Sequence, residues 1–109
     1  MKEIKFTHEN AIRHFGHDFR KIVTTRDEIK AEKLGESFII KHPDGTELIY
    51  ILYNVERTDY TLLNHFPHAE IWKCEGFESR EEFLTELKRL YPKKQELYIH
   101  WFKLLGVVT

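Results

Sequence analysis

The sequence contains little of what cross-links a chain, divides it or inserts it into a membrane. It has one cysteine among 109 residues, so no internal disulfide can form, and a lone thiol fits a reducing cytoplasm. Its three prolines and five glycines form no linker. No apolar run approaches the roughly 20 residues of a membrane span, and the N-terminus lacks the apolar core of a signal peptide. We therefore expect one cytoplasmic domain over residues 1–109, with no membrane association.

The sequence also lacks an excess of either charge. It has 17 Lys and Arg against 18 Asp and Glu, a formal net charge of -1 with seven neutral histidines. No field of the whole chain would attract nucleic acid, so any such contact must be a local patch. Core material is abundant, because 41% of the residues are hydrophobic and 14% are aromatic. The composition indicates a globular chain with a well-buried core.

Four segments are predicted to be β-strands. The run 22–25 is β-branched throughout, which favours an extended backbone. A hairpin is expected from strands 37–40 and 47–55, joined by the turn Pro-Asp-Gly at 43–45. Residues 97–102 resemble a strand buried on both faces. In the return strand of the hairpin, both alternating faces are largely apolar, as in a small barrel.

Three helices are expected around these strands. A short helix is predicted over residues 8–15 and a second over 67–73, each followed by a glycine. The third is the best marked, because Ser79 and Glu82 form a capping box ahead of an apolar stripe, and Pro92 ends it. These seven elements follow one another as αβββααβ, and with a further strand ahead of them the expected element order is βαβββααβ or close to it.

Four pieces of the sequence, taken in order, form a recognisable set. They are Arg20-Lys21-Ile22-Val23-Thr24-Thr25-Arg26-Asp27, Lys33-Leu34-Gly35-Glu36, Glu75-Gly76-Phe77-Glu78-Ser79, and Leu90-Tyr91-Pro92 with Tyr98-Ile99-His100-Trp101-Phe102. Together they resemble the ASCH domain family and within it the small bacterial N(4)-acetylcytidine amidohydrolases, over roughly residues 20–104. The chain departs from that branch at Phe19 and Ile22, where the branch usually has glycine and threonine, and these changes bear on the substrate.

The resemblance implies an α+β fold, a small PUA-like mixed β-barrel with two to three helices packed around it. It also implies a pocket for a modified nucleoside or an RNA base, and an amidohydrolase that removes the acyl group of N4-acetylcytidine. In that branch a lysine is the general base, a threonine three residues later the nucleophile, and a glutamate the proton donor. The matching residues here are Lys21, Thr24 and Glu75, with Glu70 as a rival for the acid.

The proposed chemistry suits these residue types. Amide hydrolysis by a covalent route needs a nucleophile, a base for its proton and an acid for the leaving nitrogen. Arg20 and Arg26 are available to lower the pKa of Lys21 or to stabilise an oxyanion. Trp72 or Trp101 could stack on a base, and His100 could face the pocket. No cofactor, metal or obligate protein partner is expected, and the partner class is nucleoside or RNA.

Strand geometry sets a condition on this mechanism. Positions 21 and 24 point to opposite faces of a regular strand, so Lys21 and Thr24 can meet only if Lys21 precedes the strand or a bulge intervenes. The alternative is a non-catalytic RNA-binding module on the same fold, in which the threonines are strand formers and the charged residues are solvated. Two His pairs, 14 with 17 and 65 with 68, give only a weak metal signal, and Cys74 is expected to be a small buried apolar residue.

Overall fold

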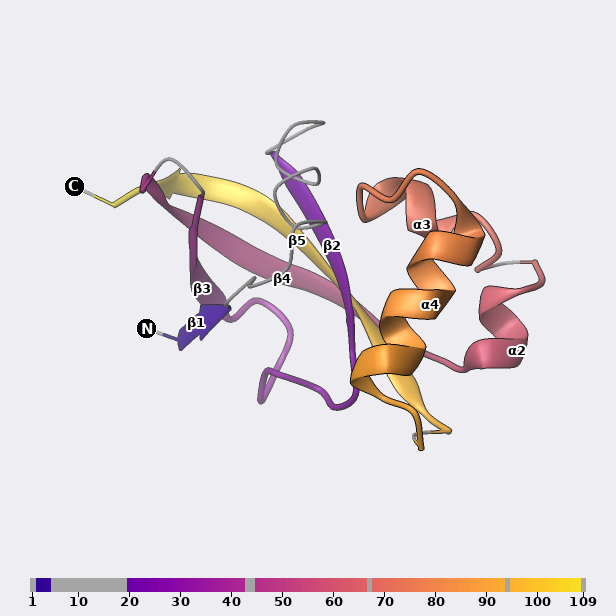
Figure 1. The fold of residues 1–109 in the computed structure, drawn as a ribbon. Helices are drawn as coiled ribbons and strands as arrows, with labels where there is room; N and C mark the ends of the chain where they lie inside the picture. The colour runs from indigo at the N-terminus through magenta and orange to yellow at the C-terminus, as the bar shows by residue number, and fades with distance from the viewer. Residues whose placement is uncertain (1, 5–19, 43–44, 67, 94, 109) are drawn as a thin grey trace.

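The computed structural model describes residues 2–4, 20–42, 45–66, 68–93 and 95–108 (Figure 1). These residues form an α+β fold, as the sequence predicts. The elements in chain order are β1 (Lys2–Ile4), β2 (Lys21–Arg26), β3 (Ser37–Lys41), β4 (Glu47–Thr58), α2 (Tyr60–Leu63), α3 (Ile71–Cys74), α4 (Arg80–Leu90) and β5 (Leu97–Val107). The helix expected over residues 8–15 and the first two residues of the 43–45 turn lie outside the described residues. No described helix is long and apolar enough to cross a membrane.

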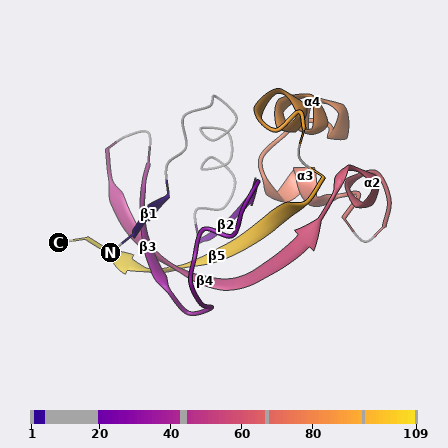
Figure 2. The ribbon, with the colours of Figure 1, turned by 90° about the horizontal axis from the view of Figure 1, so that it is seen from below.

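The strands form one sheet in the order β1-β3-β4-β5-β2, with β1 parallel to β3 and the other pairs antiparallel. The predicted hairpin is β3 with β4, and Gly45 supplies a positive φ of 92° at its turn. The β4–β5 ladder shifts register at Ile49/Tyr50 and again at Leu52/Asn54. Such irregularities bend a strand pair, and Figure 2 shows β4 and β5 curving together, with the helices at one end.

The described strands do not close into the barrel that the resemblance implied. Strands β1 and β2 lie at opposite ends of the strand order, and no ladder joins them within the described residues. One reason is visible at Thr25, whose backbone N–H donates to the carboxylate of Glu75. A side chain from the helical segment thus takes the place of a neighbouring strand at the edge of β2.

Two groups of buried hydrophobic residues lie on opposite faces of the β2–β5 pair. Neighbouring residues of β2 belong to different groups, because successive side chains of a strand alternate between its faces. The first group is Ile4, Ile22, Phe38, Ile40, Leu48, Tyr50, Leu52 and Phe102. The second, which includes the helices, is Val23, Leu63, Ile71, Phe83, Leu84, Leu87, Leu97 and Ile99. Strand β2 therefore joins the sheet core to the helical core.

The helices differ from expectation in length more than in kind. Helix α4 begins as predicted, because the Ser79 hydroxyl accepts the Glu82 N–H at 3.1 Å. The helix expected from residue 67 is shorter, since α3 spans only Ile71–Cys74. Helix α2 was not predicted, although Asp59 caps it by accepting the Leu62 N–H at 2.8 Å. Both short helices bury one apolar side chain, in the helical core.

Candidate functional site

Glu75 joins the helical segment to β2. It is the C-cap of α3, and Gly76 follows it with a φ of 82°, a conformation that suits glycine. One carboxylate oxygen of Glu75 accepts the backbone N–H of Thr25 at 2.9 Å, and the other accepts the Thr25 hydroxyl at 2.7 Å. The two residues are 50 positions apart in the sequence. The contact fixes the position of this carboxyl group at the edge of the sheet.

The surroundings of Glu75 alter its acidity. Only 8% of the residue is exposed. Burial raises the pKa of its carboxyl to about 7, because desolvation outweighs the two Thr25 hydrogen bonds and the nearby Arg26 charge, which lower it. The carboxyl is therefore present in both its protonated and its ionised form near neutral pH. Such a group can give up a proton as readily as it accepts one.

The other face of β2 carries Thr24 and Arg26, beside His100 of β5. Thr24 pairs directly with His100 across the ladder. The Arg26 Nε donates to the Thr24 hydroxyl oxygen at 3.0 Å, which orients the guanidinium. Burial lowers the pKa of Arg26, while the charges of Tyr91, Glu75 and Asp27 act in the opposite direction. An arginine stays charged through such shifts, so this face holds a fixed, partly buried cation within electrostatic reach of Glu75.

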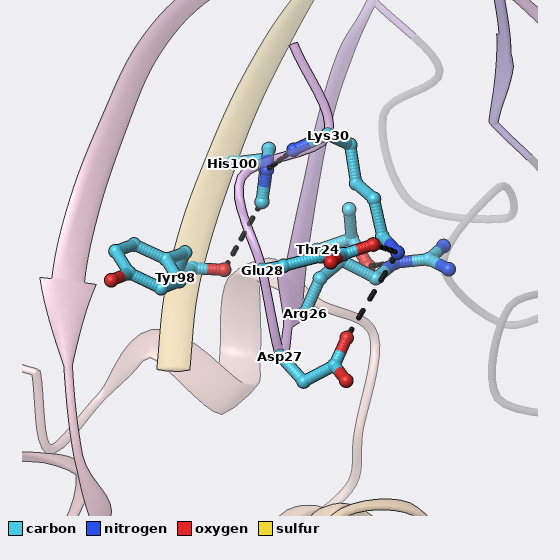
Figure 3. Close-up of polar contacts among 7 residues, drawn as sticks. All are labelled: Thr24, Arg26, Asp27, Glu28, Lys30, Tyr98 and His100. Atoms are coloured by element: carbon cyan, nitrogen blue, oxygen red, sulfur yellow. Dashed lines mark hydrogen bonds and ion pairs between the residues drawn. The ribbon is translucent and has the colours of Figure 1, made fainter. Parts of the chain in front are cut away.

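His100 is held as a neutral ring. It is fully buried, its Nε2 accepts the Lys30 backbone N–H at 3.1 Å, and its Nδ1 lies 3.0 Å from the Tyr98 carbonyl oxygen (Figure 3). An Nδ1–H that donates and an Nε2 that accepts define one neutral tautomer. Burial lowers the pKa of His100, which agrees with that tautomer. Through its hydrogen bond with the Lys30 N–H, the ring of His100 holds the loop after β2 against β5.

The loop over residues 27–30 surrounds this face with further charges. The Lys30 ammonium lies 2.9 Å from a Glu28 carboxylate oxygen and 3.9 Å from one of Asp27. Figure 3 shows the Lys30 side chain reaching back toward Asp27 and Glu28 of the same loop. The charge of Asp27 also acts on Arg26 and raises its pKa.

Tyr91 completes the cluster, and it was missed at the level of sequence. It caps the C-terminal end of α4, where its N–H donates to the Leu87 carbonyl at 2.7 Å. Burial raises the pKa of its phenol. Nearby charges also act on this pKa: Arg26 and Lys30 lower it, and Asp27 and Glu75 raise it. Figure 1 shows the end of β2 beside this end of α4. The Tyr-Pro pair marked the end of a helix, but no sequence signal placed its phenol beside Arg26.

Lys21 does not meet the geometric condition for a base acting on Thr24. All six residues of β2 pair one to one with β5, from Lys21 with Lys103 to Arg26 with Tyr98, with no bulge. Lys21 therefore shares a face with Thr25, and Thr24 points to the other side. Lys21 is also exposed. The predicted Lys21–Thr24–Glu75 assembly is not present as such: Glu75 contacts Thr25, and Thr24 contacts Arg26.

The remaining predicted binding residues, Glu70, Trp72 and Arg20, have other contacts. Glu70 is 62% exposed at its side chain and pairs with Lys73 at 2.8 Å and Arg80 at 3.7 Å, unlike buried Glu75. Trp72 packs against the helical core, with Lys73 over its ring, and its buried Nε1 has no hydrogen-bond partner among the residues that the structure describes. Arg20 is exposed, and its backbone oxygen accepts the Leu104 N–H.

The positions of Cys74 and His68 bear on two further interpretations of the sequence. Cys74 is exposed, so its assignment as a buried apolar residue is wrong; the very short α3 turns it outward. His68 is buried between the Thr58 hydroxyl at 2.8 Å and a Glu56 carboxylate oxygen at 2.7 Å. Thr58 is itself fully buried, so this chain of contacts anchors the segment before α3 to β4. Among the described residues no group of three or more His, Cys, Asp or Glu is arranged to hold a metal ion.

Comparison with known proteins supports the fold. No model of a protein family and no curated protein matches this sequence. Among solved structures, a DUF984 protein from Enterococcus faecalis is similar at a TM-score of 0.58 and 18% identity, over 90% of this chain and 72% of that one. An ASCH protein from Zymomonas mobilis, solved as two single-substitution variants, is similar at a TM-score of 0.57 and 17% identity in both, over 96% of this chain and 67% and 68% of those. The chain thus has an ASCH-like fold, as its motifs predicted.

Proposed function

We propose that this protein binds the base of a nucleoside or of an RNA at the cluster of Thr24, Arg26, Glu75, Tyr91 and His100, which we call the β2 cluster. The observation that carries the proposal is Glu75, a buried carboxyl with a pKa of about 7 within electrostatic reach of a fixed guanidinium. The edge of a base presents hydrogen-bond donors and acceptors side by side, and proteins recognise an extruded base through that edge. The ASCH-like fold is consistent with such a ligand.

The groups of the β2 cluster match an acylated cytosine in particular. N4-acetylcytidine carries an amide N–H beside an acetyl carbonyl. The Glu75 carboxylate can accept that N–H, and the Arg26 guanidinium can donate to the carbonyl oxygen. The charges of Arg26 and Glu75 both act on the phenol of Tyr91. This phenol would supply a further hydrogen-bond donor and an aromatic surface for the base. A charge-assisted pair of this kind gives both affinity and orientation.

A second candidate function, hydrolysis of that acetyl amide, is favoured by the same carboxyl. Water and N4-acetylcytidine would yield cytidine and acetate, with protonated Glu75 supplying the proton to the leaving nitrogen. Arg26 would stabilise the oxyanion formed when the carbonyl is attacked. Ionised Glu75 would take a proton from the attacking water and then pass it to the leaving nitrogen. The step then balances without Lys21, which points to the opposite face of β2 from Thr24.

One experiment separates these functions. N4-acetylcytidine and cytidine are titrated against the protein by calorimetry, and the same mixtures are assayed for cytidine and acetate. We expect saturable binding of N4-acetylcytidine that weakens at least about tenfold in Arg26→Gln, because a charged hydrogen bond is lost. Arg89→Gln, which changes an exposed arginine on α4, is the matched control and should bind as the parent does. Acetate release that disappears in Glu75→Gln would support hydrolysis; absence of binding would overturn the proposal.

A further inference from the structure

Thr25 contacts Glu75 through two different kinds of donor. Its backbone N–H donates to the Glu75 Oε1 at 2.9 Å, and its hydroxyl lies 2.7 Å from the Glu75 Oε2. Each carboxyl oxygen therefore has a partner on the same residue. Thr25 is 4% exposed and Glu75 is 8% exposed, so water has little access to replace either contact. Thr25 thus fixes both oxygens of the carboxyl that the β2 cluster presents.

The two donors of Thr25 differ in what they do when Glu75 takes up a proton. A backbone N–H can only donate, so Oε1 stays an acceptor. A hydroxyl both donates and accepts. It donates to Oε2 of the ionised carboxyl, and it can accept from Oε2 once that oxygen carries the proton. The contact at 2.7 Å can therefore persist in both states of Glu75, whereas a side chain without a hydroxyl makes it in neither.

Glu75 is the group of these surroundings whose charge changes near neutral pH. Burial raises its pKa to about 7, and both Thr25 hydrogen bonds act against that rise. The other titratable groups that interact with it are Arg26 of β2, Tyr91 at the end of α4 and Cys74 of α3. Arg26 stays charged. Burial raises the pKa of the Tyr91 phenol and of the Cys74 thiol, so both are neutral at pH 7.

We infer that Thr25 is a positioning residue of the base site, whose hydroxyl holds the Glu75 carboxyl in place in both protonation states and makes recognition of an amide N–H depend on pH. The inference rests on the proposed function, because its ligand is the one assigned to the β2 cluster. The ionised carboxyl accepts the amide N–H of N4-acetylcytidine strongly, and the neutral carboxyl accepts it weakly. By stabilising the ionised form, the hydroxyl extends recognition to lower pH.

The first measurement needs no ligand. The carboxyl carbon of Glu75, identified as the signal absent from Glu75→Gln, is followed by ¹³C NMR from pH 5 to pH 10. We expect a midpoint of about 7 in the parent. Thr25→Val should raise it by at least about one pH unit, because a hydrogen bond to the charged form is lost. Thr25→Ser keeps the hydroxyl and should titrate as the parent does. The matched control Thr85→Val removes an exposed hydroxyl of α4 and should leave the midpoint unchanged.

The second measurement is the affinity for N4-acetylcytidine at several pH values, by calorimetry. In the parent the dissociation constant should fall about tenfold between pH 6 and pH 8, as Glu75 ionises. In Thr25→Val the same fall should occur at higher pH, and its affinity should approach that of the parent at pH 9. Thr25→Ser should match the parent in both measurements, so the inference can fail even if Thr25→Val does not fold.

The outcomes separate the inference from the proposed function. The inference is overturned if Thr25→Val titrates as the parent does, or if Thr25→Ser shifts the midpoint as far as Thr25→Val. It is also overturned if the parent binds N4-acetylcytidine equally well at pH 6 and pH 8, a result that would leave the proposed function standing. Absence of binding at every pH would overturn the proposed function, while a shifted Glu75 midpoint would still support the role of Thr25 in placing the carboxyl.

Discussion

The two faces of β2 have different tasks, although they alternate residue by residue along six positions. One face carries Val23 and Thr25, which hold the helical segment through the apolar core and through Glu75. The other carries Thr24 and Arg26, which face His100 and the charged loop after the strand. The difference teaches that a basic and hydroxyl-rich motif need not act as one unit. Strand alternation divides it into a face that anchors the helices and a face at which we propose that the ligand binds.

The largest loss of stability is expected when the contact between Glu75 and Thr25 is removed. Glu75→Ala leaves a buried Thr25 N–H and hydroxyl without their acceptor, which should cost about 2–4 kcal/mol in the free energy of unfolding. Glu70→Ala is the matched control, because Glu70 is exposed and its ion pairs should contribute less than about 1 kcal/mol. Urea denaturation at pH 6 measures both. Equal losses in the two variants would contradict the assignment of Glu75, and not Glu70, as the residue that binds β2.

The buried carboxyl of Glu75 should also make the free energy of unfolding depend on pH. Glu75 has an ordinary pKa of 4.5 and a folded value of about 7, so the folded chain binds this proton more tightly than the unfolded chain. The resulting stabilisation is full below pH 4.5 and is lost as pH rises through about 7, a difference on the order of 3 kcal/mol. Glu75→Gln removes this titration and preserves the shape. We expect the stability of the parent relative to Glu75→Gln to decrease between pH 5 and pH 8.

The contribution of His100 to the free energy of unfolding changes with pH in the direction opposite to that of Glu75, over part of the same pH range. Its pKa is lowered in the folded chain, so its contribution to stability is present above its ordinary pKa of 6.5 and is lost as pH falls. Because Glu75→Gln retains His100, the difference between parent and variant isolates the carboxyl. A difference that stays constant from pH 5 to pH 8 would show that Glu75 titrates alike in the folded and unfolded chains.

A pair of neighbouring substitutions compares the two faces directly. Thr25→Val removes the hydroxyl that donates to Glu75 and should destabilise the fold by about 2 kcal/mol at pH 8, where the carboxyl is ionised. Thr24→Val removes the acceptor of the Arg26 Nε at a more polar face and should cost less than half as much. Binding of N4-acetylcytidine should weaken more in Thr24→Val than in Thr25→Val. If Thr24→Val lost more stability than Thr25→Val, and Thr25→Val lost more affinity than Thr24→Val, the anchoring face and the binding face would have been assigned the wrong way round.

Much of the fold could be predicted from local patterns. The β-branched run of β2, the hairpin of β3 and β4, and the capping box of α4 are all present. Strands β4 and β5 extend beyond their predicted ends, to Thr58 and Val107. The residues added to β4 are polar, and those added to β5 include Lys103 and Gly106. Pairing between the two strands holds these residues in the sheet. Local propensity carries no information about such pairing.

The site was predictable only in part, for the same physical reason. The family resemblance made the β2 segment and Glu75 candidates, with Glu70 as a rival. Strand alternation set a geometric condition that Lys21 does not meet. That Glu75 would contact Thr25 depends on the approach of segments 50 residues apart. The role of Tyr91 depends on where α4 ends relative to β2. Both follow from tertiary packing, which no pattern along the chain specifies.

The most direct measurement is the affinity for N4-acetylcytidine of Lys21→Ala beside that of Arg26→Ala, by calorimetry at pH 7. Lys21 is exposed and on the anchoring face, so its removal should change the dissociation constant by less than about twofold. Arg26→Ala should weaken binding at least about tenfold. Loss of binding in Lys21→Ala, with Arg26→Ala unaffected, would contradict the assignment of the ligand to the Thr24 face of β2.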